Sequence, residues 1–291
     1  MANKKNLLTR RDLMKMGVLA SGGFALLPPG GGIGRVSSFF TSNQGRSPRL
    51  TPFVDPFPTF DVLTKVRQFD PADIAPYASP YFGVDTPARI GTQCFEIDAV
   101  ERNVKFHRDL PPTSAWAYVD KNRPPASDRL ITFQFPKVTH GQPAGAGILV
   151  RHFNTLPTAP RDFGFPITTV HLHGTHSPAP ADGFPTDIMN RPADFPAHVV
   201  IRPGDHHDYM YPFRDVGFSH GQPTKDDRTS TLWFHDHLLD FTGANVYRGL
   251  ANIMPVFDDI DTGEETDAMP ALGLPSGPFD LPLVLQDKIF D

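Results

Sequence analysis

The stretches TTVHLHGTH (residues 168–176) and TLWFHDHLL (residues 231–239) place imidazoles inside segments that otherwise have the composition of buried β-strands. In each stretch, two histidines are separated by one residue and flanked by apolar or β-branched side chains. The four histidines of these H-x-H pairs are His171, His173, His235 and His237. A single H-x-H pair is commonly no more than two surface or core histidines without a ligand role. The presence of two such pairs, each in a strand-like segment, is what indicates a metal site.

Alternation along a strand predicts what the two pairs can do together. Side chains i and i+2 of a β-strand point to the same face, about 6.5–7 Å apart, so each pair presents two imidazoles in one direction. If the two strands are neighbours, about 4.8 Å apart, all four imidazoles converge on a small volume. Desolvating four unpaired imidazoles is costly, and metal ligation removes that cost. The pattern predicts a metal site but leaves copper, zinc, iron and nickel open.

Two other metal-binding patterns that contain H-x-H fit this sequence poorly. Amidohydrolases carry the motif early in a TIM barrel, whereas both pairs lie late here and the alternating helices of a barrel are missing. Metallo-β-lactamase-like hydrolases use H-x-H-x-D-H, but HLHGTH has no aspartate before His176.

The composition bounds the remaining classes. The chain has 291 residues, of which 39% are hydrophobic and 20% charged, enough for one large domain or two smaller ones. Its 32 prolines and 24 glycines disfavour long helices and favour short strands joined by turns. A net charge of −5 provides no basic surface for nucleic acid. The single cysteine, Cys94, excludes an intrachain disulfide and a multi-cysteine zinc site.

The N-terminal residues 1–30 are similar to a twin-arginine export signal. Arg10 and Arg11, in TRRDLMK, precede an apolar stretch that is shorter than the roughly 20 residues needed to span a bilayer. A disordered basic tail is the alternative. Residues 31–60 are rich in glycine, proline and serine, which predicts a linker or an arm. We therefore expect export by the twin-arginine machinery to the periplasm or the extracellular space.

Residues 61–260 favour an all-β domain. Short runs of β-branched and aromatic residues alternate with turn signals, which predicts a β-sandwich or a closed barrel. Residues 261–291 begin as an acidic, then Pro/Gly-rich linker and end in what we predict to be the opening strand of a second domain. The strands predicted for the first domain are 94–106, 129–135, 146–154, 167–174, 197–204, 207–213, 229–237 and 249–258.

The segments around both pairs resemble the first cupredoxin domain of the multicopper oxidases, most closely the branch of spore-coat laccases and bilirubin oxidases. They follow the family's order over about 125 residues. The resemblance implies a cupredoxin-like (plastocyanin-like) Greek-key β-sandwich or barrel. The matching segments are TTVHLHGTHSPAPADGFP (168–185), VIRPGDHHDYMY (200–211), TLWFHDH (231–237), NVYRGLANIMPVFD (245–258) and DLPLVLQDKIFD (280–291).

The same resemblance implies a ligand set. In this family, eight histidines hold a trinuclear copper cluster between the first and last domains, and the first domain supplies four of them. By position, His171 would ligate the type 2 copper. The ligands of the type 3 copper pair would be His173, His235 and His237.

Two aspartates accompany the implied ligands. Asp182 matches an acidic residue that helps the family to handle protons near the cluster, and capping of its Asp-Gly turn is the alternative role. Asp236 lies between two ligands, and strand alternation predicts that it points away from the metal.

Other parts of the family's apparatus are missing from this sequence. The type 1 copper requires an H-C-H-x-x-x-H segment, but Cys94 has no histidine beside it and is expected to be a small buried residue. The H-P-x-H-x-H segment, which supplies further cluster ligands, is absent as well. We expect a truncated chain that supplies half of the cluster and needs a C-terminal cupredoxin domain to complete it.

The activity implied for the full-length protein is that of a laccase or bilirubin oxidase. It would remove one electron at a time from phenols, aromatic amines, bilirubin-like pyrroles or metal ions. Four such electrons would reduce dioxygen to water. The fragment alone is expected to be inactive. The alternatives are an exported, non-catalytic structural or interaction protein on the same fold, or a copper-binding module.

Overall fold

The computed structural model describes residues 48–57, 59–67, 69, 93–142, 147–160, 162–185, 200–215, 225, 228, 230–269 and 271–290. The predicted export signal, most of the predicted arm and the first residues of the strand predicted at 197–204 lie outside the described residues. One compact unit spans Leu50–Lys288. Within the described part of the chain, no helix is both long enough and apolar enough to cross a membrane.

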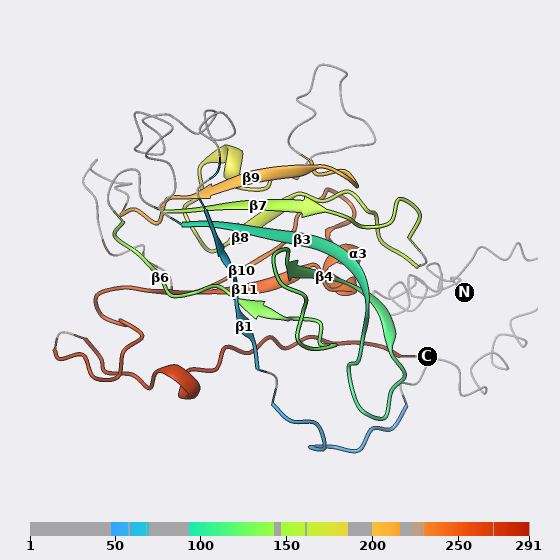
Figure 1. The fold of residues 1–291 in the computed structure, drawn as a ribbon, viewed down its shortest axis with the longest axis horizontal. Coiled ribbons are helices and arrows are strands. Elements are labelled where there is room, and N and C mark those ends of the chain that lie inside the picture. Colours follow the sequence, from blue (N-terminus) through green and yellow to red (C-terminus); the bar gives the residue numbers. More distant parts are fainter. Residues whose placement is uncertain are drawn as a thin grey trace, which may run out of the picture. The chain divides into compact units, whose positions relative to one another are not determined.

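The larger of two main sheets is built around one long strand. β3 pairs antiparallel with β2 and β4 and parallel with β7, and β7 in turn pairs antiparallel with β9. Figure 1 shows β3, β7 and β9 lying side by side. The strands of this sheet are β2 (Lys65–Val66), β3 (Gln93–Val104), β4 (Thr113–Asp120), β7 (Ile148–Asn154) and β9 (His206–Tyr211).

The smaller main sheet carries His171, His173 and His235, and His237 directly follows its strand β10. Its order is β6-β11-β10-β8, with β6 parallel to β11 and the other neighbours antiparallel. A separate parallel pair joins β1 (Asp61–Val62) to β5 (Phe133–Gln134). The strands of the smaller sheet are β6 (Val138–Thr139), β8 (Val170–His173), β10 (Thr231–Asp236) and β11 (Ala251–Phe257).

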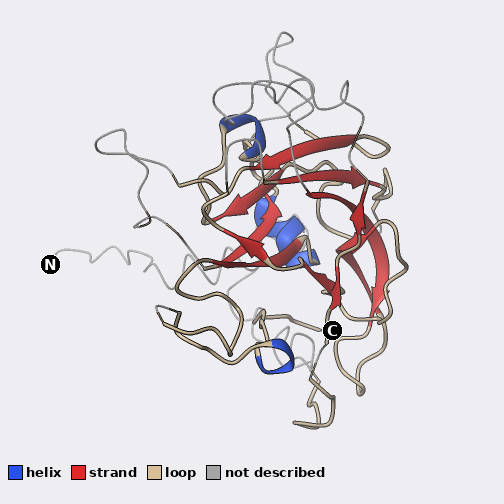
Figure 2. Cartoon of the chain, turned by 60° about the vertical axis from the view of Figure 1, so that its left-hand side comes forward, coloured by secondary structure: helices blue, strands red, loops and turns tan. Residues whose placement is uncertain are grey.

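The chain passes repeatedly between the two main sheets. After β7 in the larger sheet come β8 in the smaller, β9 in the larger and β10 in the smaller. Strands and loops make up most of the described chain, with only short helical segments (Figure 2). β3 and β7 are parallel and cannot be joined by a tight hairpin, and the chain between them passes through β4 in the larger sheet and β6 in the smaller one. The predicted all-β class and the two-sheet arrangement of a cupredoxin-like sandwich are confirmed.

Aromatic side chains fill the space between the sheets. Phe234, from β10, lies with its ring centroid 5.2 Å from Tyr118 on β4 and 5.7 Å from His152 on β7. All three side chains are at most 2% exposed. Tyr209 on β9 also reaches across, because its hydroxyl accepts a hydrogen bond from the backbone N–H of Val170, at 2.9 Å. The contacts connect both sheets to the strands that carry the histidines.

Several elements differ from the sequence prediction. β4 was not predicted because its last six residues are all buried, so that it lacks the alternation of a half-exposed strand. The strand predicted at 129–135 is reduced to the two residues of β5. Residues 280–290, where the opening strand of a second domain is predicted, form no strand, since no neighbouring strand in the described part of the chain pairs with them.

A short helix, α3 (Thr242–Arg248), was not predicted either. Seven residues make only two turns, too few for a recognisable 3.6-residue pattern. The helix stops at Gly249, whose φ is +126° and where a Cβ would lie 2.2 Å from the backbone oxygen of Trp116. Only glycine fits there. Two 3-10 helices complete the described elements, η5 (Ala179–Ala181) and η7 (Gly277–Phe279).

The buried imidazole of His152 predicts a pH dependence of stability. Burial, assisted by nearby His207, lowers the pKa of His152 to about 3. The unfolded chain takes up this proton near pH 6.5, which the folded chain does only near pH 3, so stability is lost as pH falls between these values. We expect His152→Phe to lose less free energy of unfolding than the unmutated chain between about pH 7 and about pH 4.

Urea denaturation at both pH values measures this difference. His206→Phe is the matched control, because it removes an exposed histidine from β9 and leaves His152 in place. Parallel losses in the unmutated chain and His152→Phe would contradict the prediction.

Candidate metal centre

Strands β8 and β10 are direct neighbours. Their antiparallel register places His171 opposite His235 and His173 opposite Trp233. The alternating residues Leu172 and Phe234 face inward and are almost fully buried. The two H-x-H pairs therefore share the outer face of the smaller sheet, as alternation predicts.

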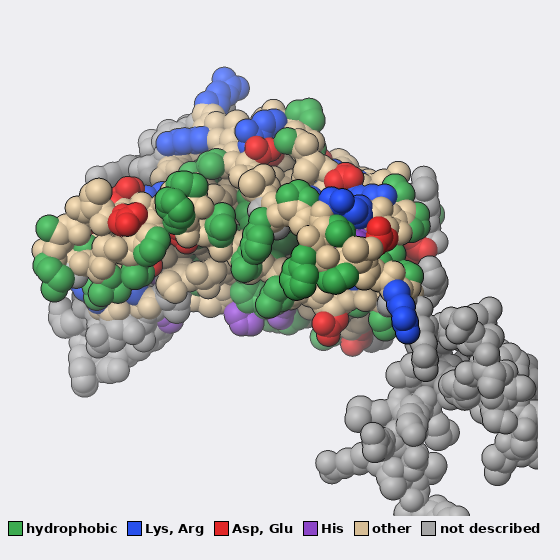
Figure 3. All heavy atoms as spheres, turned by 90° about the horizontal axis from the view of Figure 1, so that it is seen from below, with side chains coloured by type: hydrophobic (Ala, Val, Ile, Leu, Met, Phe, Trp, Pro, Cys, Tyr) green, Lys and Arg blue, Asp and Glu red, His purple; other side chains and the backbone are tan. Residues whose placement is uncertain are grey.

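The four imidazoles lie close together on that face. The ring centroid of His171 is 5.4 Å from that of His173, 5.5 Å from that of His235 and 5.0 Å from that of His237. One ring nitrogen from each of His171, His173 and His235 lies within 4.8 Å of the other two, close enough for a shared metal ion. In Figure 3, a group of histidine side chains reaches the surface beside a broad area of hydrophobic side chains.

Backbone carbonyls set the orientation of two of these rings. Nδ1 of His171 lies 2.6 Å from the carbonyl oxygen of Asp182, and Nδ1 of His235 lies 2.7 Å from that of Asp236. A carbonyl oxygen only accepts hydrogen bonds, so each Nδ1–H donates and each Nε2 keeps a free lone pair. The same arrangement is common for histidines that bind metal ions.

Ring nitrogens of the other two histidines, His173 and His237, are also placed so that they could bind a metal ion. Nδ1 of His173 lies 3.4 Å from Nε2 of His235, so the two atoms can share either a proton or a cation. Nδ1 of His237 is buried and has no hydrogen-bond partner among the described residues. An unpartnered buried nitrogen is unfavourable, and ligation would relieve it.

The centre favours neutral imidazoles. Burial lowers the pKa of His235 to about 4, and the neighbouring imidazoles act in the same direction, against the hydrogen bond to the Asp236 carbonyl. Burial also lowers the pKa of His237, again with a contribution from His171. Both shifts favour the neutral imidazole, which is the protonation state that binds metal ions.

Asp182 lies at the edge of the imidazole group. Its carboxylate Oδ1 is 3.3 Å from Nδ1 of His171, and its side chain is 50% exposed. The following residue, Gly183, has a φ of +73°, and a Cβ there would lie 2.2 Å from the carbonyl oxygen of Val170. The close approach explains the Asp-Gly sequence. The geometry permits both predicted roles for Asp182, proton transfer and turn formation.

Asp236 points into the protein, away from the imidazoles, as predicted. Its carboxylate accepts hydrogen bonds from the backbone N–H groups of Thr169 (3.0 Å) and Leu238 (3.3 Å) and from the side chain of Asn245 (2.9 Å). Burial raises the pKa of Asp236 to about 7, although these donors act in the opposite direction. In addition, the backbone N–H of His237 donates to the carbonyl oxygen of Thr169, at 2.7 Å. These bonds connect the two H-x-H segments from behind.

Asn245, on α3, supports this connection and was missed by sequence reasoning. Its side chain is fully buried and donates to the carbonyl oxygen of Phe165 as well as to Asp236. Its Oδ1 accepts from the backbone N–H of Phe165, at 2.8 Å. These partners are 9 and 80 residues away, so no local sequence pattern indicates them.

Cys94 takes no part in the centre. It lies on β3 and is 2% exposed. Burial raises the pKa of its thiol, which disfavours the thiolate that a metal ligand requires. The predicted role of a small buried residue is confirmed.

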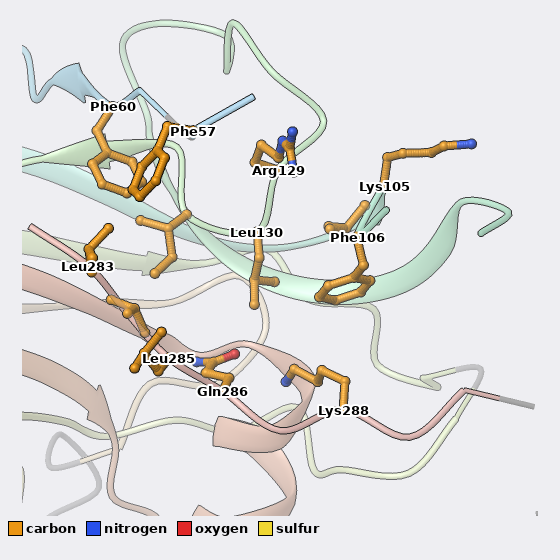
Figure 4. A pocket seen from close by; sticks show the side chains of 13 residues that line it. Phe57, Phe60, Lys105, Phe106, Arg129, Leu130, Leu283, Leu285, Gln286 and Lys288 are labelled. Atoms are coloured by element: carbon orange, nitrogen blue, oxygen red, sulfur yellow. The ribbon is translucent and has the colours of Figure 1, made fainter. Parts of the chain in front are cut away.

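A cavity of about 380 Å³ occurs elsewhere on the unit. Phe106, Leu130 and Leu285 are among its lining residues, together with the cations Arg129 and Lys288 (Figure 4). The Lys288 ammonium donates to the backbone carbonyl of Tyr247 and lies over its ring. None of the four imidazoles lines this cavity.

Comparison with known proteins identifies the family. No protein-family model matches the sequence. A laccase from Bacillus stratosphericus is 31% identical over 200 residues, which are 67% of this chain and 34% of that laccase. A bilirubin oxidase from Albifimbria verrucaria is 34% identical over 155 residues, 53% of this chain and 20% of that enzyme. The chain belongs to the multicopper oxidase family.

A third relative extends the match. A laccase from Haloferax volcanii is 28% identical over 265 residues, 86% of this chain and 37% of that laccase. The chain thus spans between 20% and 37% of the length of these three relatives. Among solved structures, a laccase from Pediococcus acidilactici aligns over 76% of this chain and 34% of that chain, at 15% identity and a TM-score of 0.43. Membership of the family implies copper as the metal for this centre.

Asn245 provides a stability test of the support behind the ligands. Asn245→Ala removes three side-chain hydrogen bonds: one of the donors to the buried Asp236 carboxylate, and the side-chain partners of the backbone N–H and carbonyl of Phe165. We therefore expect a loss of about 2–4 kcal/mol in the free energy of unfolding. Thr242→Ala, on the same helix, removes one bond to the carbonyl of Leu238 and should cost about 1 kcal/mol or less. Equal losses in chemical denaturation would refute the importance of this network.

Proposed function

We propose that the chain is the N-terminal domain of an exported multicopper oxidase of the laccase or bilirubin oxidase type, and that it supplies half of the ligands of a trinuclear copper cluster. The observation that carries the proposal is the convergence of four imidazoles on one sheet face, two of them held with a free Nε2 lone pair. Relatives named laccase and bilirubin oxidase support it.

Each ligand has a proposed place. His171 ligates the type 2 copper, and the ligands of the type 3 pair are His173, His235 and His237. Bound copper would supply the one-electron steps by which dioxygen is reduced to water. The protein orients the rings through the carbonyl oxygens of Asp182 and Asp236. The exposed Asp182 carboxylate, 3.3 Å from His171, can hold a proton at the edge of the centre.

The other half of the cluster would come from a C-terminal cupredoxin domain. Large apolar side chains remain exposed close to the ligands along the chain, with Phe184 56% exposed and Trp233 and Leu239 each 39% exposed. Apolar area of this kind around a polar centre suits contact with another domain. The C-terminal part of the protein would also carry the type 1 copper, beside which phenols, aromatic amines, bilirubin-like pyrroles or metal ions would be oxidised.

Export completes the proposal. Arg10 and Arg11 would direct the protein through the twin-arginine machinery to the periplasm or the extracellular space. A non-catalytic structural protein or a simple copper-binding module is the alternative, but retention of all four histidines favours the oxidase.

Copper binding tests the site. The purified chain should retain copper after dialysis, measured by atomic emission, whereas a variant with all four histidines replaced by alanine should retain almost none. The matched control replaces His206 and His207, an adjacent pair on β9, and should retain as much copper as the unmutated chain. If the fourfold variant and the unmutated chain retain equal copper, the site is wrong.

Sequencing the gene beyond the codon for Asp291 tests the oxidase. We expect H-P-x-H-x-H and H-C-H-x-x-x-H segments downstream, and oxygen consumption with 2,6-dimethoxyphenol by the longer product but not by the 291-residue chain. A stop codon directly after Asp291 would instead favour a copper-binding module or one half of an enzyme assembled from two chains.

A further inference from the structure

Trp233 lies on the ligand face of the smaller sheet. It precedes His235 by two residues on β10, and the register places it opposite His173 on β8. Because side chains two apart share a face, the indole is on the same side as the imidazoles. It is 39% exposed, although the next residue, Phe234, is only 2% exposed.

The indole ring is stacked against one imidazole from each strand. Its centroid lies 4.3 Å from that of His235, with the planes 28° apart, and 5.1 Å from that of His173, with the planes 23° apart. By contrast, His171 meets the same two imidazoles edge-on, at 76° and 65°. Trp233 therefore contacts the flat faces of both rings whose nitrogens approach each other.

Stacking on the indole restricts the rotation of the His173 and His235 rings, which have two nitrogens in close approach. Nδ1 of His173 and Nε2 of His235 are 3.4 Å apart, and rotation of either ring would separate them. His235 is also held by the carbonyl of Asp236. The imidazole of His173, which is exposed, depends on stacking for its orientation. Side chains that are already ordered lose less entropy when a ligand binds.

We propose that Trp233 is a positioning residue that holds His173 and His235 ready for copper. The inference rests on the proposed function of the centre. Metal ligation withdraws electrons from an imidazole, and a ring with more positive charge is attracted more strongly to the indole face. The stack therefore favours the metal-bound state over the free one.

The position of Trp233 makes it suitable for substitution. Together with Ile253 and Leu285, it borders an apolar hollow of about 470 Å³, so that a smaller side chain does not open the buried core. Trp233→Leu keeps an apolar residue on β10 but removes the stack. Trp233→Phe keeps an aromatic face. Phe279→Leu serves as the control, because it removes an aromatic side chain that is 77% exposed on η7.

The test measures the affinity of the 291-residue chain for copper(I), in competition with bicinchoninic acid. We expect Trp233→Leu to lower the affinity about ten-fold or more, as removal of supporting residues behind metal ligands commonly does. Trp233→Phe should restore most of the affinity, and Phe279→Leu should leave it unchanged. Proton NMR of the metal-free chain adds a second readout. The indole ring current should shift the imidazole signals of His173 and His235 in the unmutated chain, and this shift should be absent in Trp233→Leu.

The outcomes separate the two claims. Equal affinities for the unmutated chain and Trp233→Leu would overturn the role of Trp233 and leave the proposed function standing. Unchanged imidazole NMR signals in Trp233→Leu would likewise overturn it. Absence of copper binding by the unmutated chain would overturn the proposed function, and this inference with it.

Discussion

The antiparallel pairing of β8 with β10 is the constraint on which the centre depends, because it places His171 opposite His235. Side chains alternate along both strands, so a slip of one residue would turn the imidazoles inward and expose Leu172 and Phe234. The burial of those two apolar side chains therefore holds the register in place. A single register of β8 and β10 therefore satisfies both core packing and ligand convergence, because alternate residues of the same strands serve each purpose.

Hydrogen bonds behind the sheet connect the two ligand segments a second time. On the buried side, the Asp236 carboxylate accepts hydrogen bonds from the backbone N–H of Thr169 and the side-chain amide of Asn245. On the other side, the backbone carbonyl oxygen of Asp236 accepts one from Nδ1–H of His235. One residue thereby joins the core to the orientation of a ligand. On the outer face, Trp233 packs against His173 and His235. The centre is thus supported from both sides of a single strand.

Much of the centre was predictable from local pattern. Alternation within TLWFHDH was enough to place His235 and His237 on one face and Asp236 on the other, and the same alternation places Trp233 with the ligands. The support from Asn245 was not predictable, since it depends on a contact with Phe165, 80 residues away. β4 was missed because both of its faces are buried, and α3 because it is too short to show a period.

The pairing of β8 with β10 requires that imidazoles from both strands bind one copper ion. Copper K-edge X-ray absorption of the chain loaded with one equivalent of copper(I) tests it most directly. We expect outer-shell scattering from several imidazole rings, which diminishes when either His173 or His235 is replaced by alanine. A spectrum that lacks imidazole scattering, or that neither substitution changes, would contradict it.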